Sequence, residues 1–185
     1  SDVEEIKKRV KELLEENKRL VETIEREVRR LIEENRRLAK RILDEVRRLL
    51  EELKDRVDKD RDKDELRKEV ERLLERVKEL LDALRKHSKD VLDTVKKLLE
   101  DLRRSSEELR RTVEELVRRL EERSDSERVK KLLTDARKEV ERSLRESKKA
   151  LDELRRIVEK SLRDTERLLR TAEKEVEDVL REVER

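Results

Sequence analysis

One short stretch of the sequence, His87-Ser88 with Asp90 two residues further on, contains the residue types of a nucleophilic active site. A histidine can activate a serine when the two side chains lie within hydrogen-bonding distance. In a helix, however, adjacent side chains point about 100° apart and do not face each other. The sequence also has no glycine that could form an oxyanion loop. We therefore predict that the protein is not an enzyme.

Metal, cofactor and nucleic-acid chemistry has equally little support. One histidine and no cysteine leave only carboxylates as metal ligands, and 55 Lys and Arg residues can pair with the 53 Asp and Glu residues. Basic pairs such as Arg29-Arg30 alternate with acidic pairs such as Glu33-Glu34, at the spacing of solvated ion pairs on a helix. No aromatic residue is present to stack on a nucleic-acid base. We predict no metal site, no cofactor and no nucleic-acid partner.

The composition instead favours a helical protein with a simple interior. Charged residues make up 58% of the chain but leave a net charge of only +2, and the 32% of hydrophobic residues are mostly Leu, Ile and Val. Gly, Pro, Cys, Met, Phe, Tyr and Trp are absent, so the usual residues of sharp turns and helix breaks are missing. No apolar run approaches the roughly 18 residues that cross a membrane, and no secretion signal is recognisable. We expect a soluble chain with no membrane partner and no native location, found in the cytoplasm of an expression host.

The apolar residues recur with a fixed period along the chain. Ile6 and Val10 return as Ile24 and Val28, and the same 18-residue repeat continues in the later segments. A repeat of this length makes five turns at about 3.6 residues per turn, so the apolar positions form one stripe about 120° wide on a nearly straight helix. A stripe of this width suits a helix that packs against two others and leaves its remaining surface to water.

Two polar runs interrupt the repeat, and both contain a helix N-capping pattern, a short polar side chain three residues before glutamate. The pattern occurs as Asp62 with Glu65, Ser124 with Glu127, and Ser1 with Glu4. We predict helices at about 2–58, 63–122 and 125–185, joined by loops at about 58–62 and 123–125. Short connections make neighbouring helices antiparallel. The predicted fold is therefore all-α, an up-down-up antiparallel three-helix bundle that forms one elongated domain over residues 1–185.

Polar residues interrupt the apolar stripe at two levels, one full repeat apart, where Asn17 and Asn35 occupy the same position of the repeat. Folding the helices back on their loops places serines, and in one case His87, opposite each asparagine. On the third helix the expected partners are Ser143 and Ser161, with Ser147 and Thr165 one turn further along. We predict a buried polar network made of Asn17, Ser105, Ser106, Ser143, Ser147, Asn35, His87, Ser88, Ser161 and Thr165.

A closed network of this kind would have a structural purpose. A buried polar group without a partner costs about 1–3 kcal/mol, so a wrong alignment of the helices would leave these groups unpaired among leucines. We expect the network to specify the helix register. An alternative stays open, in which some of these side chains lie at the boundary and bond to water or to the carbonyl four residues earlier.

The sequence resembles de novo designed helical bundles that are built from ideal helices with buried hydrogen-bond networks. The resemblance covers the whole chain, and it is carried by the paired polar layers, the repeat RRLIEENRRLAKRIL and the Glu and Arg blocks of LRRSSEELRRTVEELVRRL. It implies coiled-coil-like packing, very high stability and no natural biochemical function. Related designs include heterodimers with a three-helix half and switches whose bundle accepts a further helix.

Three functional hypotheses follow from these observations. The favoured one is a designed structural scaffold, a monomer that requires no partner and whose polar layers specify helix register. The alternative is an interaction module that accepts a further helix or self-associates, which should show an apolar stripe wider than about 140°. The least favoured is an amphipathic lipid binder, because the helices lack the aromatic residues and the basic face of interfacial helices.

Overall fold

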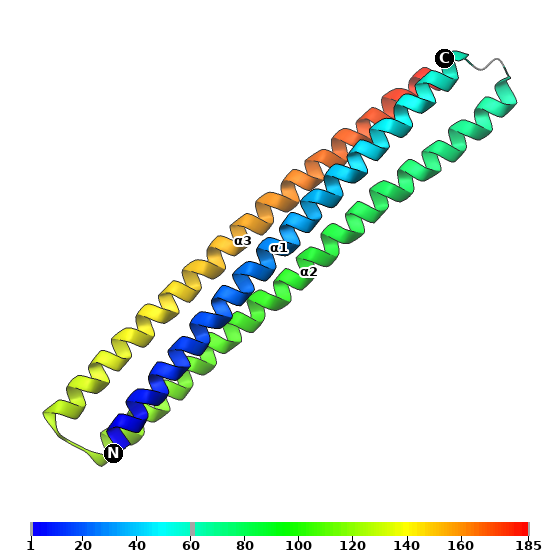
Figure 1. The fold of residues 1–185 in the computed structure, drawn as a ribbon. Helices are drawn as coiled ribbons and strands as arrows, with labels where there is room; N and C mark the ends of the chain where they lie inside the picture. Colours follow the sequence, from blue (N-terminus) through cyan, green and yellow to red (C-terminus); the bar gives the residue numbers. More distant parts are fainter. Residues whose placement is uncertain (1, 60–61, 185) are drawn as a thin grey trace. The chain divides into compact units, whose positions relative to one another are not determined.

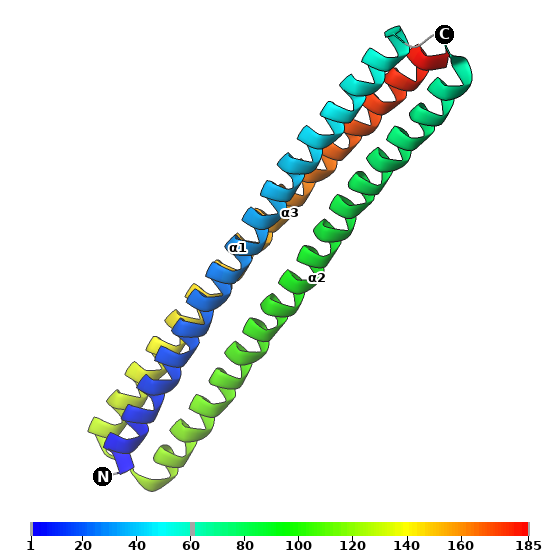
Figure 2. The ribbon, with the colours of Figure 1, turned by 45° about the vertical axis from the view of Figure 1, so that its right-hand side comes forward.

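The computed structural model describes residues 2–59 and 62–184. This part of the chain contains three helices, α1 (Asp2–Lys59), α2 (Lys63–Arg123) and α3 (Glu127–Glu184), and no strand. α1 ends one residue later than predicted, and α2 begins at the predicted residue. The all-α fold class and the up-down-up order of three antiparallel helices are confirmed (Figures 1 and 2).

Close contacts group the chain into two compact units. Unit 1 consists of Ser1–Arg29 and Thr94–Ile157, and unit 2 of Arg30–Asp93 and Val158–Arg185. Each helix contributes one segment to each unit, so each unit is by itself a packing of three helical segments. Within each unit the α2 segment runs opposite to the α1 and α3 segments (Figure 1). The organisation as one domain over residues 1–185 stays a prediction.

Each unit has its own aliphatic core, made from the stripe positions of all three helices. The core of unit 2 includes Val46, Leu53, Val77, Leu84, Leu169 and Ala172, each at most 3% exposed. The core of unit 1 includes Val10, Leu109, Val113, Val117, Leu120, Leu133 and Val140. Because full burial of a Leu or Val side chain contributes about 1.5–3 kcal/mol, the apolar repeat is the main source of stability in both units.

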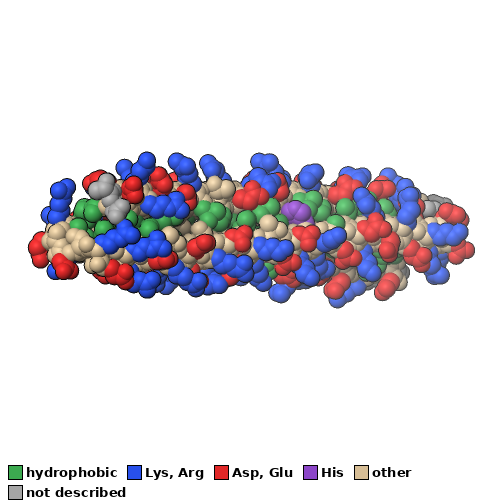
Figure 3. Space-filling model, turned by 90° about the horizontal axis from the view of Figure 1, so that it is seen from below, with side chains coloured by type: hydrophobic (Ala, Val, Ile, Leu, Met, Phe, Trp, Pro, Cys, Tyr) green, Lys and Arg blue, Asp and Glu red, His purple; other side chains and the backbone are tan. Residues whose placement is uncertain are grey.

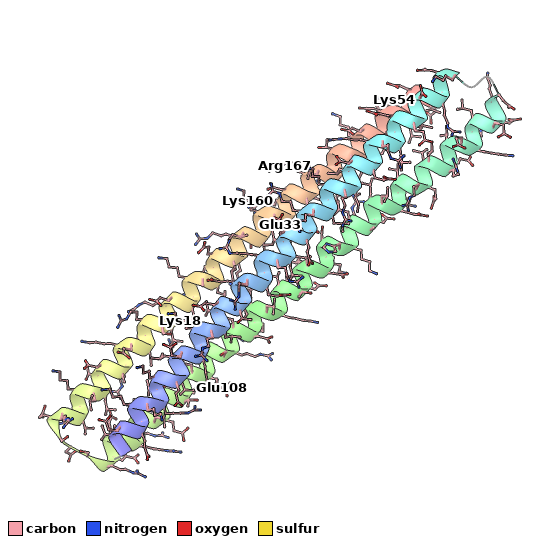
Figure 4. All side chains as sticks on the ribbon, viewed as in Figure 1. Lys18, Glu33, Lys54, Glu108, Lys160 and Arg167 are labelled. Carbon is pink, nitrogen blue, oxygen red and sulfur yellow. The ribbon has the colours of Figure 1, made fainter. Side chains whose placement is uncertain are left out.

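The surface carries charges of both signs. On the face drawn in Figure 3, Lys and Arg side chains are interleaved with Asp and Glu, and apolar side chains are visible between them. The labelled Lys18, Glu33 and Lys54 of α1 are exposed, as are Glu108 of α2 and Lys160 of α3 (Figure 4). Most ion pairs link residues three or four apart on one helix, such as Arg30 with Glu34 and Arg119 with Glu115. Pairs of this exposed type contribute at most about 1 kcal/mol each.

The N-terminus of α2 is capped as the sequence predicts. Asp62 accepts a backbone hydrogen bond from Asp64 at 3.1 Å and one from Glu65 at 3.5 Å through its carboxylate. Its backbone carbonyl accepts the first intrahelical bond, from Leu66. The carboxylate thus satisfies amide groups that have no partner inside the helix.

The predicted start of α3 is wrong by two residues. The cap is Ser126, whose hydroxyl accepts from the Val129 amide at 3.2 Å, and the helix begins at Glu127. Ser124, the predicted cap, instead accepts from the Ser126 amide at 3.4 Å, which is a local serine turn inside the connection. The connection, at 124–126, therefore lies one residue later than the predicted loop at 123–125. The third predicted cap, Ser1, lies outside the described residues.

Candidate functional site: two buried polar layers

Both asparagines of α1 lie in the interior. Asn17 is 3% exposed and Asn35 is 1% exposed, so their amide groups are removed from water as completely as the leucines around them. The helix places them there because both occupy the repeat position that faces the other two helices. A buried amide needs up to two donors and two acceptors as partners. The surrounding hydroxyls and the imidazole therefore decide whether each asparagine is tolerated.

The Asn35 layer, formed by Asn35, His87, Ser88 and Thr165, joins all three helical segments of unit 2. The Asn35 Oδ1 atom accepts a hydrogen bond from the Ser88 hydroxyl at 3.1 Å and contacts His87 Nδ1 at 2.9 Å. Asn35 Nδ2 donates to Thr165 Oγ1 at 3.3 Å. Since the amide oxygen can only accept, His87 Nδ1 must carry the proton of the ring in this arrangement. The oxygen of Asn35 thus has two donors on α2, and its nitrogen has an acceptor on α3.

The Asn17 layer, formed by Asn17, Ser105, Ser106 and Ser147, lies in unit 1 and is less complete. Asn17 Nδ2 donates to Ser147 Oγ at 2.8 Å, which matches the bond of Asn35 to Thr165. Asn17 Oδ1, however, is buried and has no hydrogen-bond partner among the described residues. Ser105 and Ser106 are half-buried and make no hydrogen bond to it. The expectation that α2 would supply a partner at this level is wrong.

The α3 members of both layers form a second bond within their own helix. Ser147 Oγ donates to the Ser143 carbonyl at 3.0 Å, and Thr165 Oγ1 donates to the Ser161 carbonyl at 3.1 Å. Because the hydroxyl proton is used in this way, the oxygen is left as an acceptor for the asparagine Nδ2. This fixes the nitrogen of both amides toward α3, and the oxygen of Asn35 faces its partners on α2.

The predicted α3 partners are therefore displaced by about one turn. Ser143 and Ser161 were expected opposite the asparagines, but their side chains are half-buried and contribute no hydrogen bond. The residues in contact are Ser147 and Thr165, both buried. The register of α3 therefore differs from the expected one by about one turn, which the one-residue shift of the connection to 124–126 does not explain. Ser147 and Thr165 have the same spacing as Asn17 and Asn35, but so do Ser143 and Ser161, and the sequence contains no signal that separates the two pairs.

A third level at the same repeat positions is apolar, and the sequence reasoning did not identify it. One repeat away from Asn35, Ser88 and Thr165, in the direction of the C-terminal end of α1, lie Leu53 on α1, Val70 on α2 and Val183 on α3. Leu53 is 0% exposed and Val70 is 7% exposed, and Val183 packs against the same cluster. We call this set the Leu53 level. It shows that the same backbone position accepts an aliphatic side chain without a polar partner.

The side chains of the Asn35 layer are not arranged as a serine with its base. His87 Nδ1 and Ser88 Oγ both contact the same oxygen of Asn35, and the Ser88 hydroxyl donates to that oxygen. Among residues 2–59 and 62–184, no group of three or more His, Cys, Asp and Glu side chains is placed to hold a metal ion. None of the helices described is long and apolar enough to span a membrane.

The ion pairs that shift pKa values lie at the surface, among exposed or partly exposed side chains. Arg103 donates to Glu100 through Nε and Nη2, at 3.0 and 2.6 Å, and to Glu107 through Nη1 at 2.7 Å. The hydrogen bond from Arg103 lowers the pKa of Glu100 from its ordinary value of 4.5. In unit 2, the hydrogen bond to Glu173 of α3 raises the pKa of Arg85 of α2. These ion pairs join residues within α2 and, in unit 2, join α2 to α3.

Comparison with known proteins identifies the fold. No protein-family model matches the sequence, and no curated protein matches it. Among solved structures, a computationally designed three helix bundle has a TM-score of 0.76 and 18% sequence identity, over 98% of this chain and 90% of that chain. At this identity the likeness concerns the fold alone. The resemblance to designed bundles is confirmed at that level: the chain has the fold of a designed three-helix bundle, and buried polar side chains form hydrogen bonds inside it.

Proposed function

We propose that the protein is a designed structural scaffold without catalytic activity or a natural biochemical function, in which the two polar layers specify the register of the helices. The likeness to a designed bundle supports the first part of this proposal. The observation that carries the second part is the Asn35 layer, where the three helical segments of unit 2 each contribute a polar side chain to one hydrogen-bonded group.

The apolar repeat alone leaves the register ambiguous. Because the stripe is periodic and has similar residues in every turn, leucine and valine would still meet leucine and valine after a slip. A slip by one turn within a chain, or an exchange of helices between two copies with an offset of one repeat, would keep most of the apolar contacts. Something other than hydrophobic burial must therefore separate the correct alignment from these alternatives.

The order of the three levels supplies this discrimination. Along α1 the repeat position reads Asn17, Asn35 and Leu53, and along α3 it reads Ser147, Thr165 and Val183. Only one alignment places both polar residues of α1 beside both polar residues of α3. An offset of one repeat would place one asparagine beside Val183 or a hydroxyl beside Leu53. Each such mismatch leaves a buried polar group unpaired, at a cost of about 1–3 kcal/mol.

The proposal can be tested with a variant in which polar residues of both layers are replaced by the aliphatic residues of the Leu53 level. The variant carries Asn17→Leu, Ser106→Val, Ser147→Val, Asn35→Leu, Ser88→Val and Thr165→Val. Spin labels on cysteines introduced at Glu33 and Lys160, both in unit 2 and both exposed, report the alignment of α1 with α3. We expect one narrow distance distribution in the parent protein, and several distances or mixed oligomers in a variant that remains helical.

A matched control changes two side chains of the Asn35 layer but keeps their hydroxyl groups. The double variant Ser88→Thr and Thr165→Ser should preserve the single narrow distribution of spin-label distances, because every donor and acceptor of the layer is retained. If the variant with the six apolar substitutions gave the same narrow distance distribution as the parent protein, the layers would not specify the helix register.

One observation favours the second candidate, an interaction module that associates with another copy of the chain. In unit 1, a groove of about 510 Å³ is lined by apolar residues of α1 and α3, including Ile6, Leu14, Leu132 and Ala136. Ile6 and Ala136 are half-buried there, whereas Ile42 and Ala172, at the same repeat positions in unit 2, are buried. A helix from another copy could cover this groove, and the molecular mass in solution tests this possibility.

A further inference from the structure

The groove of about 510 Å³ in unit 1 lies where the packing of α1 against α3 lacks a large aliphatic side chain. One repeat position on each helix borders this side of the interior: Lys7 and Ala136 line the groove, and their counterparts Leu43 and Ala172 belong to one core cluster. The residues at these two positions are Lys7 and Ala136 in the first repeat, Glu25 and Leu154 in the second, and Leu43 and Ala172 in the third. Leu154 is 1% exposed and Leu43 is 7% exposed, so each later repeat buries one leucine. The first repeat has no leucine at either position.

The walls of the groove are aliphatic and accessible. Ile6 and Leu14 of α1 and Leu132 of α3 line it and are half-buried, whereas Val10 and Leu133 line it and are buried. The lining residues of α1 extend over about 18 Å at 1.5 Å per residue, so the groove suits an extended chain. Its volume lies within the range of about 300–1,000 Å³ that is usual for small-ligand sites.

The two edges of the groove carry opposite charges. Lys7 and Lys11 are exposed on the α1 edge, where Glu15 follows them, and Asp135 and Glu139 are exposed on the α3 edge. Among the described residues, no ion pair joins these lysines to these carboxylates. The α1 edge is therefore available to an anionic group and the α3 edge to a cationic group.

The later repeats show the same edges joined across the helices. Arg29 lies 3.8 Å from Glu153, and Arg47 lies 3.8 Å from Glu175. Lys11 is the residue at the position of these arginines in the first repeat. The first repeat thus differs from the other two both in the missing leucine and in the missing ion pair above it.

We propose that this groove binds a free single-chain amphiphile whose head group carries both charges. The alkyl chain takes the place of the missing leucine beside Ala136, and its removal from water drives binding. The anionic part of the head group lies toward Lys7 and Lys11, and the cationic part lies toward Asp135 and Glu139. This assignment goes beyond the scaffold function and holds whether or not the polar layers specify register.

The test uses three amphiphiles with the same alkyl chain, an alkyl sulfobetaine, an alkyl sulfate and an alkyltrimethylammonium salt, each below the concentration at which it forms micelles. Binding is measured by calorimetry and by NMR shifts of the Ile6 methyl groups, with Ile42, at the same repeat position in unit 2, as the internal control. We expect one sulfobetaine per chain, shifts at Ile6 and none at Ile42. Because the edges are exposed, the sulfobetaine should bind only about two- to fivefold more tightly than the two singly charged amphiphiles.

Substitutions taken from the other repeats separate the groove from the rest of the surface. Ala136→Leu copies Leu154 and should abolish binding by filling the groove, and Lys7→Leu, which copies Leu43, should do the same. The matched control Ala83→Leu adds a leucine at an exposed alanine of α2 in unit 2 and should leave binding unchanged. Circular dichroism verifies that each variant remains helical.

The proposal fails if the Ile6 methyl groups do not respond, if the alkyl sulfate or the ammonium salt binds most tightly, or if the filled variants bind as the parent protein does. A mass of two chains that persists in the presence of the sulfobetaine would also overturn it, because another copy would then occupy the groove.

Discussion

At the scale of single residues, the two asparagines have the same backbone position but different numbers of partners. Asn35 makes contacts through both its oxygen and its nitrogen, whereas Asn17 bonds to protein only through its nitrogen. The free energy lost when a buried polar atom has no partner is about 1–3 kcal/mol. The same residue type therefore contributes differently to stability in the two units.

Replacing each asparagine by leucine, the residue found at position 53, should reveal this difference. Asn35→Leu removes the acceptor of Ser88 and His87 and the donor to Thr165, whereas Asn17→Leu removes one bond and one unpaired oxygen. We expect the Asn17 variant to be the more stable of the two by about 1–3 kcal/mol. Guanidinium unfolding followed by circular dichroism measures the difference. A lower free energy of unfolding for the Asn17 variant would contradict the bonding described here.

The lowered pKa of Glu100 leads to a pH-dependent effect at the surface. A carboxyl group whose pKa is lower in the folded state adds stability above its unfolded value of 4.5, and that contribution is lost as the pH falls through the lowered folded value. Glu100→Gln should therefore reduce the melting temperature at pH 7, and the difference from the parent should disappear in strong acid. Glu108→Gln, at an exposed residue of the same helix, is the control. A pH-independent effect of Glu100→Gln would show that the ion pair with Arg103 is not its cause.

The sequence was sufficient to predict that Asn17 and Asn35 are buried, because a residue on an apolar stripe about 120° wide must face its neighbours. It was not sufficient to predict their partners. Ser143 and Ser147 lie one turn apart on the same face of α3, so the repeat by itself does not decide which of them meets Asn17. The missing bond from Ser105 was equally hidden, because it depends on the reach of one side chain across a helix interface.

At the scale of the helices, the ends are determined by short side chains that satisfy the first free amide groups. Asp62 does this for α2 and Ser126 does it for α3. The sequence predicted the first because Asp62 is followed by Glu65 at the capping-box spacing. It misplaced the second because Ser124 has that spacing to Glu127, whereas the true cap, Ser126, is followed three residues later by Val129. The capping-box pattern thus selects the wrong one of two nearby serines.

Alanine substitutions at these two serines distinguish a cap from a turn residue. Ser126→Ala removes the acceptor of the Val129 amide and should lower the free energy of unfolding by about 1 kcal/mol. Ser124→Ala removes only a 3.4 Å contact within the connection and should have a smaller effect. Hydrogen exchange at the Val129 amide should accelerate in the first variant alone. Equal effects of the two substitutions would be inconsistent with Ser126 as the cap.

At the scale of the whole molecule, the composition and the period were enough for the fold class. A chain with no glycine or proline, three uninterrupted periodic segments and two short polar runs has few alternatives to three antiparallel helices. The similarity in fold to a designed bundle agrees with this conclusion. The Leu53 level was missed because an aliphatic residue in an apolar stripe gives no signal of its own. Only its alignment with two polar levels makes it informative.

Self-association separates the two proposed functions. A scaffold that is complete as one chain should have a mass near 22.6 kDa in light scattering after gel filtration. A multiple of this mass would favour the interaction module and would direct attention to the groove around Ile6 and Ala136. In that case Ala136→Glu, which adds a charge to the groove, should restore the mass of a single chain.

The 18-residue repeat of each helix also means that one repeat can be inserted or exchanged as a unit. Because five complete helical turns fit into one block, inserting the block 24–41 a second time would return every following residue of α1 to its original angular position. The same operation on α2 and α3 would add matching blocks to the other two helices. The bundle could then be lengthened by whole 18-residue repeats. At each added repeat, either the residues of the Asn35 layer or those of the Leu53 level could be chosen, and the resulting order of polar and apolar levels would specify the helix register of the longer protein.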